Sequence, residues 1–244
     1  MRNLRLDICY DGTRYQGWQR LKDNDNTIQG KIEDALSRIL EEEIKISGSG
    51  RTDAGAHAIG QVANFRCESE MSCQDILQNL RKYLPGDIGI YSCRDASERF
   101  HARLNAKRKT YCYRIWNSEK PCVFDRRFVH VLEAKLNIDR MQQAAEYFCG
   151  QHDFAAFCTN SKSKKSTIRE INSLMVEATG DEIRISVTGD GFLYNMVRII
   201  AGTLVEVGLD LKNPDSIPEL FGGRREQCGP TLPAKGLCLM EVEY

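Results

Sequence analysis

A single acidic side chain stands out because of the small residues around it. Residues 49–55 read Ser-Gly-Arg-Thr-Asp-Ala-Gly, and Asp53 lies near the middle of this segment. The residues before it alternate into a short apolar strand, and Gly50 and Gly55 allow the backbone to turn tightly, so a strand would lead directly into a loop. Such a loop would hold one carboxylate clear of its neighbours, which makes Asp53 the first candidate for chemistry. The same segment could be an ordinary glycine turn whose aspartate caps a helix.

Several motifs, in the same order along the chain, resemble one known family. Residues 50–57 are similar to the active-site signature of the tRNA pseudouridine synthase A family, Gly-Arg-Thr-Asp-Ala-Gly-Val-His, with Ala56 in place of the valine. The other matching motifs are Tyr10-Asp11-Gly12-Thr13, Gly17-Trp18-Gln19, Phe100-His101-Ala102-Arg103, Lys109-Thr110-Tyr111-Cys112-Tyr113, His152-Asp153-Phe154, Gly191-Phe192-Leu193-Tyr194-Asn195-Met196-Val197-Arg198, Gly202-Thr203-Leu204 and Ala234-Lys235-Gly236-Leu237. The resemblance spans essentially the whole chain, and the shared order makes it more specific than any single motif.

The resemblance implies an enzyme that isomerises uridine to pseudouridine at positions 38 to 40 of the tRNA anticodon stem-loop, without a guide RNA and as a homodimer. This reaction breaks the bond between ribose and N1 of uracil, rotates the base and rejoins it through C5. Because it is an isomerisation, we expect no redox cofactor and no metal. Two other classes stay open: a catalytically inactive module that binds tRNA or rRNA, and a nucleoside or sugar hydrolase, which would need a second carboxylate to activate water.

The resemblance also assigns roles to individual residues. Asp53 would be the nucleophile beside the glycosidic bond, and the choice between attack on the sugar and attack on the base stays open. A stacked uridine must be extruded into a pocket, and Arg51 would fill the gap that the base leaves. Tyr111 would stack on the detached uracil and leave it free to rotate. Without the resemblance, Arg51 would be interpreted as a surface arginine and Tyr111 as a core residue of a strand.

Arg198 is the candidate partner of the Asp53 carboxylate. An ionised acid in a closed pocket is stabilised by a nearby cation. Arg198 lies within Met196-Val197-Arg198-Ile199-Ile200, where apolar neighbours make an unpaired charge costly. A structural ion pair with another acid is the alternative. Phe154 and Leu237 are predicted to line the walls of the pocket.

The net charge of the chain is zero, but the charges are segregated. Between Arg99 and Arg127 there are nine basic residues and two acids, a net charge of 9 − 2 = +7, so the rest of the chain carries −7. Basic residues interleaved with aromatic ones combine phosphate neutralisation with rings on which bases stack. The aromatic residues of this segment include Tyr111, Tyr113, Trp116 and Phe124. The predicted RNA contacts are Arg103, Lys107, Arg108, Lys109 and Arg114.

A charged segment of this kind can also be a merely solvated face. A second basic cluster contains Lys162, Lys164, Lys165 and Arg169. We favour an RNA-binding groove on an otherwise acidic protein.

The composition narrows the class of protein. A chain of 244 residues with 41% hydrophobic content can form one large domain or two ordinary ones. Its first residues lack a secretory signal and no apolar run reaches the length of a membrane span, so we expect a soluble, cytoplasmic protein. The ten cysteines are scattered without a Cys-x-x-Cys pair, and the four histidines lack ligand-like spacing. We therefore expect buried thiols and no zinc site.

Apolar periodicity predicts an α+β fold of two similar halves, 1–104 and 105–244, with the boundary near Ala102 to Lys107. In the first half the expected elements are strands over 4–10, 61–66 and 88–93 and helices over 27–40 and 72–83. In the second half they are strands over 110–116 and 237–242, helices over 137–148 and 195–207, and a hairpin of 171–178 with 182–188. The resemblance implies that each half is reminiscent of an RNA-recognition module, and that the antiparallel sheets join around a central catalytic cleft.

Overall fold

The computed structural model describes residues 1–159 and 166–244, which form two compact units. Unit 1 contains Met1–Lys107 together with Leu239–Tyr244, and unit 2 contains Arg108–Cys238. The division after Lys107 falls at the end of the predicted boundary region. The final strand departs from the predicted halves, because most of it belongs to unit 1. Lys162, Lys164 and Lys165 of the second basic cluster lie outside the described residues.

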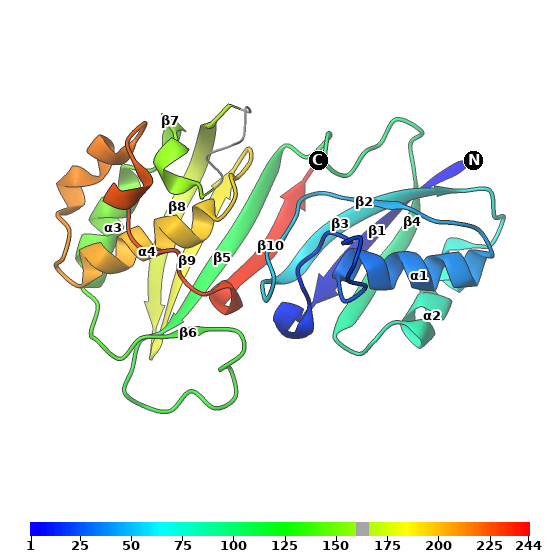
Figure 1. The fold of residues 1–244 in the computed structure, drawn as a ribbon, viewed down its shortest axis with the longest axis horizontal. Coiled ribbons are helices and arrows are strands. Elements are labelled where there is room, and N and C mark those ends of the chain that lie inside the picture. Colours follow the sequence, from blue (N-terminus) through cyan, green and yellow to red (C-terminus); the bar gives the residue numbers. More distant parts are fainter. Residues whose placement is uncertain (160–165) are drawn as a thin grey trace. The chain divides into compact units, whose positions relative to one another are not determined.

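Unit 1 is built on an antiparallel sheet (Figure 1). Its elements are β1 (Arg2–Tyr10), α1 (Ile28–Leu40), β2 (Ile46–Gly48), β3 (His57–Cys67), α2 (Cys73–Tyr83), β4 (Ile88–Ala96) and most of β10 (Leu237–Glu243). The strand order is β4, β1, β3, β10, with the short β2 paired to β3. The helices α1 and α2 lie side by side in this unit.

The buried residues of unit 1 recur with the period expected for each strand or helix. From Leu4 to Tyr10 every second residue of β1 is buried, and the buried residues of α1 and α2 recur on one face of each helix. The fully buried apolar side chains of these elements are Leu4, Leu6, Ile8, Ile28, Ile32, Leu36, Ile76 and Leu80. Both helices begin where the sequence predicts, because the side chains of Thr27 and Ser72 accept hydrogen bonds from the first turn.

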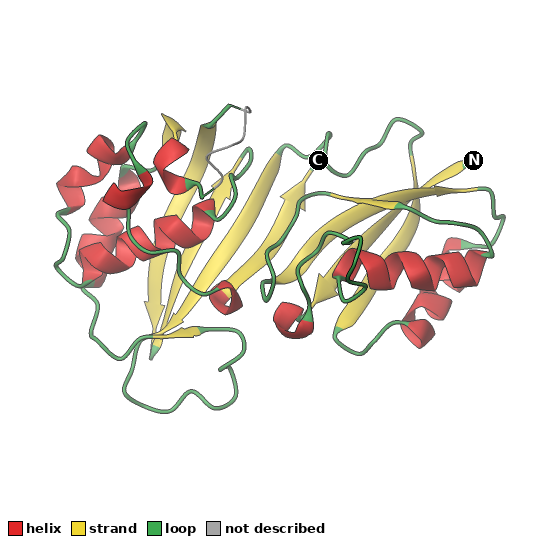
Figure 2. Cartoon of the chain, viewed as in Figure 1, coloured by secondary structure: helices red, strands yellow, loops and turns green. Residues whose placement is uncertain are grey.

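Unit 2 is a second mixture of helices and antiparallel strands (Figure 2). Its elements are β5 (Arg108–Trp116), β6 (His130–Val131), α3 (Ile138–Glu146), β7 (Gly150–Asp153), β8 (Ile168–Thr179), β9 (Glu182–Gly189) and α4 (Met196–Gly208), followed by three short 3₁₀ helices, Pro214–Leu220, Arg225–Gln227 and Ala234–Gly236. The strand order is β5, β9, β8, β7, and β6 pairs in parallel with the end of β5. The α+β fold class predicted from the sequence is confirmed.

Helix α4 is buried on nearly every side, which explains its continuous apolar sequence. A Cβ atom at Gly202 would lie 1.9 Å from the carbonyl oxygen of Pro230, so the helix and this segment approach each other at a distance that only glycine allows. Beside α4, an aromatic cluster forms part of the core of the unit. Its rings are Phe148, His152, Phe154, Phe157 and Phe221.

No helix in the described ranges, 1–159 and 166–244, combines the length and the apolar character needed to cross a membrane.

Candidate active site

The Asp53 loop, residues 49–56, joins β2 to β3 and is tied to the start of β3 by Gln61. The Ser49 hydroxyl donates to Gln61 Oε1 at 2.6 Å, and Gln61 Nε2 donates to the carbonyl of Gly50 at 3.1 Å. Both side chains are completely buried. Buried polar groups that satisfy one another in this way favour one conformation. The first residues of the loop are therefore fixed to the sheet.

Thr52, directly before the candidate nucleophile, is held by two separate segments of unit 1. Its hydroxyl shares a buried hydrogen bond of 2.8 Å with the hydroxyl of Tyr10, at the end of β1. Its carbonyl accepts the N–H of Trp18 at 3.1 Å. Gly17 has a φ of +89°, and a Cβ atom there would lie 2.7 Å from the Thr52 oxygen. The close approach of these two backbones therefore needs glycine at position 17.

Asp53 itself begins a tight turn. Its carbonyl accepts the N–H of Ala56 at 3.1 Å, and Gly55, with a φ of +79°, donates its N–H to Tyr15 at 3.3 Å. The Asp53 side chain is half-buried, whereas Arg51 is exposed. Within the described chain, no hydrogen bond or ion pair engages the Arg51 guanidinium. The loop thus fixes the backbone on both sides of a carboxylate and leaves an arginine side chain to solvent.

His57 is a positioning residue that the sequence reasoning missed, although it lies within the quoted signature. The buried imidazole accepts the N–H of Gly12 through Nδ1 at 3.0 Å. Since this nitrogen uses its lone pair for Gly12, its 3.3 Å contact with Asp11 Oδ1 is not an ion pair. A Cβ atom at Gly12 would lie 1.8 Å from the carbonyl oxygen of Ala56. The turn after β1 therefore packs directly against the end of the Asp53 loop.

Arg198 projects from the first turn of α4 in unit 2 and is held in place by its own unit. Its Nε donates to the carbonyl of Leu232 at 2.7 Å, and Nη1 donates to Asn195 Oδ1 at 2.7 Å. In return, Leu232 donates its N–H to the carbonyl of Arg198 at 3.3 Å. The guanidinium is half-buried. Its orientation is set by these bonds, which is what a cation positioned for an anionic partner requires.

Tyr111 lies on β5, opposite Val187 of β9, and is 7% exposed. The rings of Tyr111 and Phe192 make an edge-to-face contact, with centroids 5.1 Å apart and an interplanar angle of 82°. Phe192 belongs to the motif that leads into α4. The strand and the adjoining aromatic ring thus hold Tyr111 in a fixed orientation.

The two predicted pocket-lining residues occupy different environments. Phe154 is completely buried, with Phe157 at 5.7 Å and Phe221 at 5.4 Å between ring centroids. This enclosure favours a packing role for Phe154 over direct contact with a base. Leu237, at the start of β10, is 6% exposed.

The residues predicted to contact RNA differ in their exposure to solvent. Arg103, Lys107 and Arg108 are exposed, and Lys109 is half-buried. Arg114 instead makes two 2.8 Å contacts with the carboxylate of Glu182. The hydrogen bond from Arg114 is the main cause that lowers the Glu182 pKa to about 2. Arg114 is thus engaged in a structural ion pair, which leaves its guanidinium less available to phosphate.

Among the described residues, no group of three or more histidine, cysteine, aspartate or glutamate side chains is arranged to hold a metal ion.

Comparison with known proteins gives a consistent result. A family model described as tRNA pseudouridine synthase matches residues 8–105 and 144–244. Arg51, Asp53 and Arg198 lie within the matched ranges, and Tyr111 lies between them. "tRNA pseudouridine synthase A 2" of Bacillus cereus (strain ZK / E33L) is 45% identical, with 100% of both chains covered. "tRNA pseudouridine synthase A" of Bacillus sp. (strain KSM-64) is 46% identical and "tRNA pseudouridine synthase A 2" of Clostridium perfringens (strain 13 / Type A) is 43% identical, again over 100% of both chains.

Replacing Thr52 by valine tests how the Asp53 loop is held. The substitution keeps the shape of the side chain but removes its hydrogen bond to the Tyr10 hydroxyl, so we expect a loss of about 1 kcal/mol in the free energy of unfolding. Amide hydrogen exchange should also become faster at Trp18. Urea denaturation and exchange measurements check both effects. The matched control, Thr179→Val at the exposed end of β8, should change neither, and an unchanged Thr52→Val protein would contradict the proposed restraint.

Proposed function

The chain belongs to the tRNA pseudouridine synthase family, and we propose that it acts at positions 38 to 40 of the tRNA anticodon stem-loop without a guide RNA. It is an isomerase that converts uridine to pseudouridine in tRNA. The position of the target within tRNA is the finer part of the proposal, and it is supported by the full-length similarity to relatives named tRNA pseudouridine synthase A.

The isomerisation makes three demands on the protein. The bond from ribose C1′ to N1 of uracil breaks, a bond from C1′ to C5 forms, the C5 proton leaves and N1 gains a proton. A nucleophile must assist the cleavage, the base must first leave the helical stack, and the detached ring must be held while it turns.

The observation that carries the proposal is the construction of the Asp53 loop. Hydrogen bonds from Tyr10 and Trp18 fix Thr52, and the turn from Asp53 to Ala56 fixes the other side. A carboxylate on so constrained a backbone is held ready to react, which reduces the rearrangement needed in the transition state. We assign the nucleophile to Asp53.

Four further residues complete the proposed site. Arg51, exposed next to Asp53 in sequence, takes the space that the extruded uridine leaves in the tRNA. Tyr111, which is held by β5 and Phe192, stacks on the detached uracil. Arg198 is the cationic partner of Asp53 in this proposal, supported by the two hydrogen bonds that fix its guanidinium. Leu237 forms part of the pocket wall.

The proposal includes a homodimer that acts in the cytoplasm. It is supported by the similarity to the family over the whole chain. A homodimer allows one subunit to hold the target uridine while the other braces the body of the same tRNA.

The position of the target is tested with tRNA transcripts labelled with tritium at C5 of uracil. Isomerisation releases the label to water, because C5 loses its proton when it bonds to ribose. We expect release from a transcript with uridines at positions 38 to 40 and none when these are replaced by cytidine. Equal release from both transcripts would contradict the assigned position. Release of free uracil instead would indicate a hydrolase, and binding without any release would indicate an inactive RNA-binding module.

Replacing Asp53 by asparagine or alanine tests the nucleophile. Both variants should bind tRNA within severalfold of the wild-type affinity, because the exposed cations remain, and both should form no pseudouridine. Filter binding and nucleoside analysis of the tRNA measure the two properties. Asp23→Asn, which removes an exposed carboxylate of unit 1, is the matched control and should behave as wild type. Detectable pseudouridine formation by Asp53→Ala would exclude the role.

Replacing Arg198 tests the charge partner. Arg198→Met should lower kcat by at least about 30-fold, or ~2 kcal/mol, because a charge pair loses its cation. Arg198→Lys should also lose rate, because an ammonium group cannot reproduce two hydrogen bonds in the guanidinium geometry. Thermal unfolding of each variant separates this effect from a loss of folded protein. The control, Arg140→Met, removes an arginine paired with Asp210 in the same unit and should keep full rate. Normal turnover by Arg198→Met would remove the ion pair from the mechanism.

A further inference from the structure

The loop between β5 and β6, residues 117–129, presents the most exposed large apolar side chain of the described residues. Phe124 is 93% exposed, and its neighbour Val123 is 56% exposed. Single apolar residues are common on protein surfaces, so exposure alone does not identify a binding site. The construction of the loop and the charges around Phe124 provide two further observations.

The 117–129 loop is ordered by its own hydrogen bonds, although it contains no helix or strand (Figure 2). Trp116 Nε1 donates to the carbonyl of Lys120 at 2.8 Å, and the Arg126 guanidinium donates to the carbonyl of Val123 at 2.6 Å. The N–H of Phe128 donates to the carbonyl of Asp125 at 2.7 Å. The ring of Phe124 is therefore held towards solvent by a backbone that is already arranged. Such a loop loses little conformational entropy when it binds a partner.

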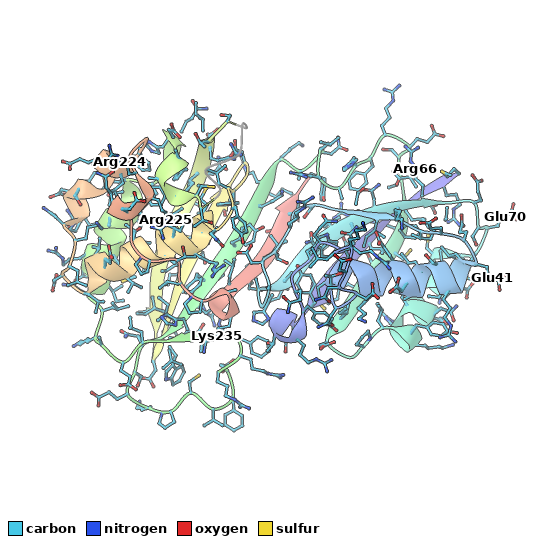
Figure 3. All side chains as sticks on the ribbon, in the orientation of Figure 1. Glu41, Arg66, Glu70, Arg224, Arg225 and Lys235 are labelled. Carbon is cyan, nitrogen blue, oxygen red and sulfur yellow. The ribbon has the colours of Figure 1, made fainter. Side chains whose placement is uncertain are left out.

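The charges beside Phe124 are mainly positive. Arg126 and Arg127 follow it closely in sequence and are exposed. Lys235, labelled in Figure 3, lies against the same loop, because its Nζ donates to the carbonyl of Arg126 at 3.4 Å. Burial is the main cause that lowers the pKa of His130, which directly follows the loop. The positive charge of Lys235 is the second cause.

Two acids near the loop pair with cations other than Arg126 and Lys235. Asp125 is 3.5 Å from the Arg114 guanidinium, and Lys120 is paired at 3.0 Å with Asp181, outside the loop. Glu119 is the remaining acid of the loop. An exposed aromatic ring among cations combines base stacking with phosphate neutralisation, which are the two features that single-stranded RNA requires.

We propose that the 117–129 loop is a tRNA-binding element in which Phe124 stacks on an unpaired base while Arg126 and Lys235 contact the flanking phosphates. The inference rests on tRNA as the substrate in the proposed function. The loop lies between the two ranges that the family model matches, 8–105 and 144–244. The proposed role of the loop is therefore separate from the Asp53 chemistry.

A second copy of the chain is the less favoured partner for this surface. The centres of interfaces between identical subunits are apolar and depleted of charged residues. Here the exposed apolar area is small and two arginines follow the ring. Nucleic acid accommodates both features in one contact, because every base offers a stacking face and every phosphate a negative charge.

The test measures tRNA affinity by filter binding with full-length variants of Phe124. Phe124→Ala should weaken binding by roughly 5- to 100-fold, the range expected for one base stacked on an aromatic ring. Phe124→Trp should keep wild-type affinity, whereas Phe124→Leu, which is apolar without a ring, should bind as weakly as the alanine variant. Tyr83→Ala is the matched control, since it removes an exposed ring on α2 of unit 1 and should leave affinity unchanged.

A perfectly paired RNA duplex separates stacking from phosphate contact. Phe124→Ala should bind the duplex as well as wild type, because the duplex offers no unpaired base. Arg126→Gln combined with Lys235→Gln should weaken binding to tRNA and to duplex alike. It should also reduce the slope of log affinity against log salt concentration by up to about 2.

Three results would overturn the inference. The first is unchanged tRNA affinity of Phe124→Ala, and the second is an equal loss on the paired duplex. The third is full tRNA affinity in Phe124→Leu together with a changed sedimentation coefficient in Phe124→Ala, which would indicate a contact between copies of the chain. Tritium release by the wild-type protein is followed in parallel. No tritium release by the wild-type protein would contradict the proposed function. Normal release together with unchanged tRNA affinity of Phe124→Ala would contradict only the proposed role of the loop.

Discussion

The fixed backbone of Thr52 is the constraint on which the proposed chemistry depends. Two segments that precede the loop by tens of residues, the end of β1 and the turn at Trp18, meet at this one residue through its hydroxyl and its carbonyl. Glycine at position 17 makes the approach possible, since any Cβ atom would collide with the Thr52 oxygen. An aspartate on a mobile loop would have to be ordered in each catalytic cycle. Here folding of unit 1 has already ordered it.

Two arginines of unit 2 with similar sequence contexts donate hydrogen bonds to different kinds of acceptor. Arg114 and Arg198 both lie among apolar residues, and both are half-buried. Arg114 is satisfied by Glu182, a carboxylate on the neighbouring strand β9, and the pair therefore stabilises the sheet. Arg198 donates hydrogen bonds to two neutral oxygen atoms, those of Leu232 and Asn195. Neutral acceptors fix the direction of a guanidinium without cancelling its charge.

The sequence predicted those features that have a local cause. Helix α1 was recognisable because Thr27 caps it and its apolar residues recur on one face. Asp53 was recognisable because the signature around it is contiguous. The position of β10 beside β3 and the four-residue β7 had no local signal, since strand pairing with distant residues determines both. Gln61 was missed for the same reason, because its role exists only once β3 folds back on the loop.

The density of basic residues in the sequence is a poorer guide to RNA contacts than the ion pairs that the structure shows. The basic segment from Arg99 to Arg127 appears uniform in the sequence, yet Arg114 is paired with Glu182 and Lys120 with Asp181. Each internal pair removes a cation from the charge that phosphate can meet. The excess that remains on the 117–129 loop is therefore small and local, and it surrounds an exposed ring on an ordered backbone. A small excess of charge gives weak, sequence-independent attraction, whereas a ring in a fixed position can select an unpaired base, so this loop is better suited to positioning tRNA than to capturing it.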